Sequence, residues 1–223
     1  MKNTLSHIAF IMDGNNRWSK IKNISKFQSY SKGANNLIRL SKNIFENTEI
    51  KYITAFALSA NNLKRSKKLI DIILNILELN LDHALNNKIN FSISIRGDLR
   101  FLNNKIKTKI KLLEKKNLIY KKKLVILMNY SGRQDIVDTF HNINTANKKF
   151  TINNFYENSI LHDLPDPEIL VRTGGFQRIS DFLLFNISFT EFFFTKKLWP
   201  DLNYSDLKKI IYKYNMIERK FGY

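Results

Sequence analysis

A carboxylate and an arginine follow a short apolar run near the start of the chain. Residues 8–12 are apolar, and Asp13 comes next, followed by a glycine, two asparagines and Arg17. An aspartate supplies a hard oxygen ligand of the kind that Mg²⁺ takes, and the planar fork of an arginine suits phosphate oxygens. The spacing therefore predicts a metal-bound phosphate beside Asp13. The alternative is that Asp13 caps a helix that begins near Asn15, and spacing alone leaves both open.

A second group of charged residues lies late in the chain. Arg172 and Arg178 flank a pair of glycines, and Ser180 follows the second arginine. This pattern predicts an anion site distinct from the Asp13 loop, and two anion sites imply two phosphorylated substrates. Because the chain has no GxxxxGK[ST] loop and no GxGxxG turn, nucleoside triphosphates and dinucleotides are poor candidates. Glu191 is an acid close to this group, although an ordinary surface position on a helix or strand also accounts for it.

The elements that must position these residues alternate along the chain. Short apolar runs typical of buried strands cover residues 8–12, 52–58, 91–95, 124–128 and 169–171. Segments with helical periodicity lie between them, at residues 32–46, 67–86, 103–116 and 134–147. This alternation predicts an α/β fold with a mainly parallel central sheet and helices on its faces.

In a parallel sheet the carboxyl ends of the strands meet at one edge, where ligands bind. Polar clusters follow all of the predicted strands, at residues 13–17, 59–65, 96–98, 129–133 and 172–180. We therefore expect these clusters to converge on one rim. The apolar helix expected at residues 67–86 is interrupted by acids and is short for a membrane span, so we expect it to line the core or an apolar cavity.

The composition favours a single intracellular domain. With 223 residues, 43% hydrophobic content and no linker rich in proline, glycine or serine, residues 1–223 can form one core. Cysteine is absent and no signal peptide is evident, so we expect a cytoplasmic protein. The net charge of +18 raises the alternative of a nucleic-acid-binding protein. Lysine and asparagine are spread through every segment, however, so a general bias in residue usage accounts better for the charge.

Seven blocks of sequence carry a resemblance to a known family. They are HIAFIMDGNNRWSK, ALSANNLKRS, IRGDLRFL, LMNYSGRQDIV, RTGGFQRISDFLL, TEFFFTKKLWPDL and ERKFGY. In this order the chain resembles the cis-prenyltransferases of the undecaprenyl diphosphate synthase type, from about residue 7 to residue 223. The resemblance implies a homodimeric transferase that uses Mg²⁺ to condense isopentenyl diphosphate onto an allylic diphosphate, usually farnesyl diphosphate, with cis stereochemistry.

The resemblance further implies a long-chain product, such as the undecaprenyl carrier lipid of cell-wall synthesis, and an apolar tunnel for the growing chain. The helix at residues 67–86 can supply one wall of that tunnel. Because the product is a hydrocarbon and the surface is rich in lysine, we also expect peripheral contact with the inner face of the membrane. We expect no nucleic-acid partner.

The resemblance also assigns roles to individual residues. It implies Asp13 and Asn62 as catalytic residues, and Asp13 and Glu191 as metal ligands. An asparagine at the Asn62 position is thought to assist removal of a proton, although a neutral amide is a weak base. The implied substrate-binding positions are Gly14, Asn15, Asn16, Arg17, Trp18, Lys26, Tyr30, Ser59, Ala60, Asn61, Leu63, Arg65, Arg172, Arg178, Ile179 and Ser180. Residues 14–17 would hold the allylic diphosphate, and residues 172–180 would hold isopentenyl diphosphate.

Five positions depart from the family pattern. Asn16 stands in place of a glycine, Lys26 of an arginine, Tyr30 of a histidine, Leu63 of a tryptophan and Phe176 of a glutamate. A lysine keeps the charge without the fork of an arginine, a tyrosine cannot shuttle protons near neutral pH, and the missing glutamate removes a carboxylate from the metal neighbourhood. A noncatalytic partner subunit of a heteromeric prenyltransferase is a further alternative, but such a subunit has no use for the retained aspartate and arginines.

Overall fold

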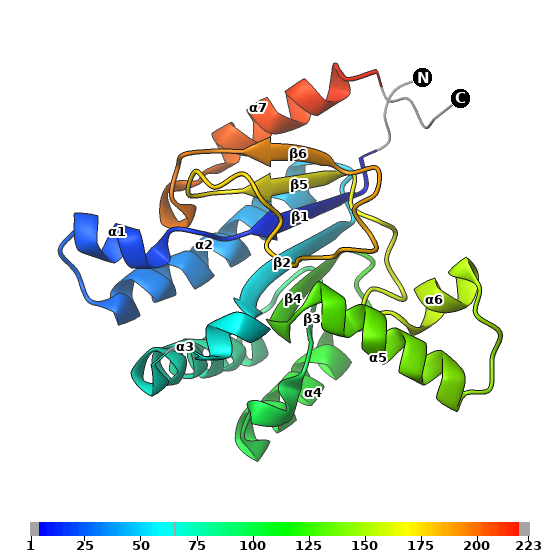
Figure 1. Cartoon of the computed structure of the whole chain (residues 1–223). Coiled ribbons are helices and arrows are strands. Elements are labelled where there is room, and N and C mark those ends of the chain that lie inside the picture. The colour runs from blue at the N-terminus through cyan, green and yellow to red at the C-terminus, as the bar shows by residue number, and fades with distance from the viewer. Residues whose placement is uncertain (1–4, 65, 219–223) are drawn as a thin grey trace.

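A six-stranded, fully parallel sheet forms the centre of the molecule. The structure is a computed structural model, and it describes residues 5–64 and 66–218. The strands lie in the order β3-β4-β2-β1-β5-β6, which runs from bottom to top in Figure 1. Their bounds are β1 His7–Ile11, β2 Tyr52–Ser59, β3 Ser92–Arg96, β4 Lys123–Tyr130, β5 Ile169–Arg172 and β6 Glu191–Phe194. The predicted α/β class is confirmed, and β1 to β5 match the five predicted strands.

The order of the strands reverses at β1. The chain leaves β1 to form β2 on one side of it and later returns to place β5 on the other side. Open α/β sheets bind ligands at such a switch point, outside the carboxyl ends of the strands. Because all the strands run in the same direction, the polar segments that follow them lie along one edge, as predicted. We call this edge the carboxyl edge.

Seven α-helices accompany the strands in the part of the chain that the structure describes. Their bounds are α1 Asn15–Ile21, α2 Lys26–Asn47, α3 Lys67–Asn86, α4 Asn104–Asn117, α5 Gly132–Thr145, α6 Ile152–Asn158 and α7 Tyr204–Asn215. The predicted helix at residues 67–86 agrees with α3 at both ends. The predicted start of α2 at residue 32 is wrong, because Ser25 and Gln28 form a capping box that starts the helix at Lys26.

Two hydrophobic clusters cover the two faces of the sheet. The larger cluster joins Ile8 and Phe10 of β1 to α2, α3, α4 and α7. The smaller cluster joins Ala9 and Ile11, which alternate with them, to buried residues of the segment 161–187. Since β1 is buried on both faces and paired along both edges, it gives the loop that follows it a rigid origin.

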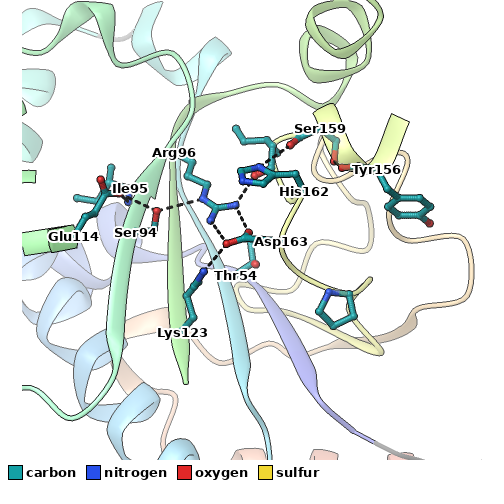
Figure 2. Close-up of polar contacts among 12 residues, drawn as sticks. Thr54, Ser94, Ile95, Arg96, Glu114, Lys123, Tyr156, Ser159, His162 and Asp163 are labelled. Atoms are coloured by element: carbon teal, nitrogen blue, oxygen red, sulfur yellow. Dashed lines mark hydrogen bonds and ion pairs between the residues drawn. The ribbon is translucent and has the colours of Figure 1, made fainter. Parts of the chain in front are cut away.

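A polar clamp fastens the segment before β5 to the other half of the sheet, as Figure 2 shows. Arg96 of β3 and Lys123 of β4 both bind the carboxylate of Asp163, and Arg96 Nη1 also donates to the Ile160 carbonyl at 2.7 Å. Burial alone would raise the pKa of Asp163, but hydrogen bonds from Arg96 and Lys123 outweigh it and hold that pKa well below its usual range. The clamp therefore keeps Asp163 charged and anchors the approach to β5.

No helix within residues 5–64 and 66–218 is long and apolar enough to cross a membrane. The apolar residues of α3 are used inside the protein instead. Leu69, Ile76 and Leu81 are buried, and other α3 residues pack against the larger cluster, as predicted for a helix that lines the core.

Candidate active site

The loops after β1 and β5 meet at the carboxyl edge. β5 pairs with β1 so that Arg172 lies opposite Ile11, the last residue of β1. The Thr173 hydroxyl and the Trp199 backbone N–H both donate to the Asp13 carbonyl, at 2.7 and 3.0 Å, and so hold the turn after β1. Asp13 and Arg172 are 159 residues apart in the sequence, yet this arrangement places them side by side.

Asp13 and Arg172 form an ion pair. Arg172 Nε and Nη2 donate to Asp13 Oδ2 at 3.0 and 2.6 Å. The Arg172 side chain is 4% exposed and the Asp13 side chain 38% exposed, so the pair meets solvent through its carboxylate. Arg172 Nη1 also donates to Ser180 Oγ at 2.7 Å and to the Arg178 carbonyl. The capping alternative is right that a helix begins at Asn15, but wrong that Asp13 caps it, because Gly14 is the N-cap residue and no side chain caps α1.

Arg17 extends from the first turn of α1 to the loop after β5. Its Nη2 donates to the Gly174 carbonyl at 2.7 Å. Gly174 has a φ of +85°, and a Cβ built there would lie 2.3 Å from Arg17 Nη2 and 2.9 Å from Asp13 Cβ. Both the backbone conformation and the close approach therefore require glycine. The segments after β1 and β5, which the sequence analysis predicts to form two distinct anion sites, are therefore in direct contact.

The Phe176 side chain lies among three arginines. Its ring centroid is 4.3 Å from Cζ of Arg178, 5.2 Å from that of Arg17 and 5.7 Å from that of Arg172. The residue is 43% exposed. We call these four residues the arginine cluster. Three guanidinium groups gathered around one point beside a single carboxylate can bind a polyanion such as a diphosphate.

An apolar pocket of about 140 Å³ begins at Met12 and Asn15, next to Asp13. It lies between α2, α3 and the sheet. Its lining is apolar except for Asn15, Tyr30 and Asn80. An apolar cavity of about 150 Å³ holds one benzene molecule, so this pocket accommodates about one five-carbon unit. The resemblance implies a longer tunnel, and buried core side chains lie beside this pocket between the helices and the sheet. Phe45 and Phe91 are among them, with ring centroids 5.1 Å apart.

Most other predicted substrate positions lie on α1 and at the start of α2. Asn16 is exposed on α1, and the Trp18 indole donates to Asp201 Oδ1 at 2.9 Å. Lys26 is the exposed first residue of α2, and Tyr30 lines the pocket. These residues surround the Asp13 loop, as the resemblance implies for substrate contacts.

The loop after β2 supplies a further group of predicted positions. Ser59 ends β2, and Ala60, Asn61, Asn62 and Leu63 form a short 3₁₀ turn, held by a 3.1 Å hydrogen bond from the Asn62 N–H to Ser59 Oγ. Among the described residues, no hydrogen bond joins Asn62 to Asp13 or to the arginine cluster. Ile179 packs against the smaller hydrophobic cluster, and Arg65 lies outside the described residues.

Glu191 does not join Asp13 within one chain. It is the first residue of β6, and its backbone N–H donates to the Glu168 carbonyl, just before β5. In register it lies level with Ile169 and therefore at the opposite end of the strands from the Asp13 loop, roughly 10 Å or more away along the strand direction. Within the described ranges, no group of three or more His, Cys, Asp and Glu side chains could hold a metal ion. The resemblance implies the metal role of Glu191, and that role stays a prediction, because the register of β6 places this residue away from Asp13 within one chain.

Some residues of the site carry no predicted role. Thr173, Gly174 and Trp199 support the Asp13 loop and Arg17, and Phe176 lies at the centre of the arginine cluster rather than only marking a lost carboxylate. The sequence did hold a signal for Trp199, because tryptophan and proline are rare in this chain, with two and three residues, and they occur together at residues 199 and 200. The position of Phe176 among the arginines had no signal, because it depends on contacts between distant segments of the chain.

Comparisons with known proteins identify the family of this chain. The family described as "Putative undecaprenyl diphosphate synthase" matches residues 11–222. The isoprenyl transferase of Rickettsia sibirica is 34% identical over 225 residues, which cover 98% of each chain, and that of Thermotoga maritima is 33% identical over 224 residues, which cover 97% of this chain and 96% of the relative. Two solved structures are also similar. Lavandulyl diphosphate synthase from Lavandula x intermedia, in complex with dimethylallyl diphosphate, has a TM-score of 0.90 at 27% identity and 98% coverage of each chain. A probable undecaprenyl diphosphate synthase from Campylobacter jejuni has a TM-score of 0.84 at 29% identity, with 99% of this chain and 100% of that chain covered.

Proposed function

This chain belongs to the undecaprenyl diphosphate synthase family of cis-prenyltransferases, and we propose that it elongates an allylic diphosphate with isopentenyl diphosphate. Farnesyl diphosphate is the proposed primer, and the product is a longer cis-polyprenyl diphosphate of the kind that serves as a carrier lipid. The structural relative in complex with dimethylallyl diphosphate, a shorter allylic compound, supports an allylic substrate.

The observation that carries this proposal is the junction between a charged site and an apolar pocket. Met12 and Asn15 line the pocket, whereas Asp13 and Arg17, from the same short segment, belong to the charged site. An allylic diphosphate has the same two parts, a polyanionic head and a hydrocarbon chain. As the diphosphate leaves, positive charge develops on C1 and negative charge on the leaving oxygens, so fixed donors around the head stabilise the transition state.

We assign the allylic diphosphate to Arg17 and residues 14–16, and isopentenyl diphosphate to Arg172, Arg178 and Ser180. Arg172 is held by Asp13, by Ser180 and by a backbone carbonyl, which fixes its guanidinium before any substrate binds. Two diphosphates bound on either side of this side chain would bring the reacting carbons together. Asn62 is proposed to orient water or diphosphate during removal of the proton.

Mg²⁺ fits the Asp13 side of this site. Both arginine contacts fall on Asp13 Oδ2, so Oδ1 lies outside the ion pair, and the side chain is 38% exposed. Mg²⁺ commonly takes one or two protein carboxylates and completes its coordination with substrate phosphates and water, so a single carboxylate is sufficient where diphosphates bind. We propose Asp13 as the protein ligand. When bound, the metal would neutralise charge on the leaving diphosphate.

Transfer of radiolabelled isopentenyl diphosphate to farnesyl diphosphate tests the proposal. We expect the purified chain to incorporate label in the presence of Mg²⁺ and to lose incorporation when EDTA is added. Arg178→Ala should reduce incorporation at low substrate concentration. Arg100→Ala serves as the matched control, because the Arg100 side chain is 91% exposed and follows a different strand at the same edge.

The same assay separates the alternatives. An absence of incorporation with dimethylallyl, geranyl and farnesyl diphosphates in every divalent metal tried would contradict the proposal. Incorporation that appears only after a second homologous chain is added would make this chain a noncatalytic partner subunit.

We also propose a homodimer formed through α5. Ile136, Val137 and Phe140 are exposed on this helix, and Phe140 stacks on the exposed Phe150 with ring centroids 4.3 Å apart. Exposed apolar patches of this kind mark interaction sites, and the family resemblance supports a second copy as the partner. Val137→Glu should produce monomers in size-exclusion chromatography with light scattering. Leu79→Glu, at an exposed leucine on α3, should leave the oligomeric state unchanged.

Peripheral contact with anionic membranes is proposed through the segment between α4 and β4. Leu118 and Ile119 are 76% and 80% exposed there, and exposed Lys115 and Lys121 flank them. Apolar side chains can enter the headgroup region while lysines bind anionic lipids. Sedimentation with anionic vesicles should fall as salt concentration rises, and binding that resists high salt would require another attachment.

A further inference from the structure

The Phe176 ring lies against the Arg178 guanidinium. Within residues 5–64 and 66–218, the Arg178 side chain makes no hydrogen bond or ion pair, and its guanidinium lies 4.3 Å from the ring centroid. The other two arginines of the cluster have polar partners of their own. Arg17 donates to a backbone carbonyl, and Arg172 binds Asp13 and Ser180. Arg178 therefore depends on the ring more than they do.

The environment of Phe176 argues against a role in the core. The residue is 43% exposed and belongs to neither hydrophobic cluster. Three cations that face one anion site repel one another when the site is empty, because few counter-charges lie among them. The negative face of an aromatic ring attracts guanidinium groups and offsets this repulsion without adding an anion that would compete with a substrate.

We propose that Phe176 is a positioning residue that holds Arg178 in place to receive a diphosphate group. This inference rests on the proposed function and deepens it, because it names a residue that prepares the diphosphate site without being a donor to it. A leucine at this position would keep an apolar side chain but would lose the ring face. A tryptophan would keep and strengthen it.

Binding of inorganic diphosphate, measured by calorimetry on the purified full chain, tests the proposal without any transfer reaction. We expect Phe176→Leu to weaken binding by about 2- to 30-fold, the range expected for a cation–π contact between exposed and desolvated sites. Phe176→Trp should restore binding to the wild-type level or better. Phe192→Leu is the matched control, since Phe192 is 42% exposed on β6 and its ring stacks on Phe194.

A double-mutant cycle shows whether Phe176 acts through Arg178. In an Arg178→Ala background, Phe176→Leu should change diphosphate affinity much less than it does in the wild-type background. In the transfer assay, Phe176→Leu should raise the KM for isopentenyl diphosphate with little change in kcat, as expected when a binding group is lost rather than a group that reacts.

Each outcome supports or overturns the proposal. Equal diphosphate affinity in Phe176→Leu and wild type, or an undiminished effect in the Arg178→Ala background, would overturn it. Tighter binding by Phe176→Leu would also overturn it and would mean that the ring obstructs the site. If the wild type binds no diphosphate, the inference fails even where transfer is observed. Diphosphate binding that depends on Phe176 in a protein without transfer activity would instead overturn the proposed function alone.

Discussion

Replacing Asp13 by asparagine should separate the chemical role of this residue from its structural role. The substitution removes the negative charge and keeps an oxygen that can accept a hydrogen bond from Arg172. It leaves a guanidinium that is 4% exposed without its counter-charge. We therefore expect two effects, a moderate loss of stability and a loss of prenyl transfer by orders of magnitude.

The size of the stability loss follows from the surroundings of the pair. Removing one partner of a fully buried ion pair costs about 3–5 kcal/mol. Asp13 is 38% exposed, and Arg172 keeps Ser180 and a carbonyl as acceptors, so we expect about 1–3 kcal/mol. In a domain of this size that corresponds to a fall in Tm of about 2–12 °C. A domain with a typical stability of about 5–15 kcal/mol stays folded after such a loss, so unfolding cannot account for the missing activity.

Circular dichroism melts and label incorporation should be measured on the same preparations of wild type, Asp13→Asn and Asp71→Asn. Asp71 is exposed on α3 and serves as the control for loss of one acid. An unchanged Tm in Asp13→Asn would refute the energetic importance of the ion pair. A folded Asp13→Asn protein that keeps a substantial fraction of wild-type incorporation would refute the metal assignment.

Three further results are expected. Arg178→Ala should raise the KM for isopentenyl diphosphate more than that for the primer, since a lost charged contact costs about 1.5–3 kcal/mol, and steady-state kinetics that show an effect on the primer alone would reverse the two sites. Stability should fall as pH falls from about 6.5 toward 4, because burial lowers the pKa of His7 to about 4 and the unfolded chain therefore binds a proton that the folded chain does not. Neutral His7 therefore contributes about 3 kcal/mol to the free energy of unfolding at neutral pH, relative to a pH at which it is protonated. Urea unfolding at several pH values should show this pH dependence, and His7→Gln should remove it. Leu77→Ala should enlarge the apolar pocket and shift the products to longer chains, as measured by mass spectrometry. Leu79→Ala, on the exposed face of α3, should leave the products unchanged. An unchanged product distribution in Leu77→Ala would show that the pocket does not limit chain length.

The parts of the fold that could be predicted are those with strong periodicity. β1 to β5 are apolar runs buried in one sheet, and α3 combines a continuous apolar face with clear ends. α6 escaped prediction and α1 appeared only as an alternative, because they bury almost nothing, only Ser19 in α1 and no residue in α6. β6 escaped because its four residues alternate between half-buried and exposed, so it lacks the buried run that marks the other strands. The capping boxes before α2 and α7 were usable signals in the sequence.

The site was predictable as a set of residues but not as a set of contacts. Asp13, Arg17, Arg172 and Ser180 were identified by type and spacing, and the structure brings all four together. Which arginine would neutralise Asp13 depends on β5 pairing directly with β1, and periodicity carries no information about strand order. The same limitation applies to Glu191, because only the register of β6 reveals the end of the sheet at which it lies.

The position of β1 between β2 and β5 has a consequence for protein synthesis. Residues 7–11 are made before the other five strands, yet one of the two strands that pair with them is not made until residues 169–172 appear. Until then the nascent chain can build β3-β4-β2-β1 but leaves the apolar β1 as an unpaired edge, a typical starting point for aggregation. The proposed diphosphate site is also incomplete during this period, since Arg172 and Arg178 are made with or after β5. Chains that end before β5 therefore lack Arg172 and Arg178 and expose an apolar strand edge at the same time.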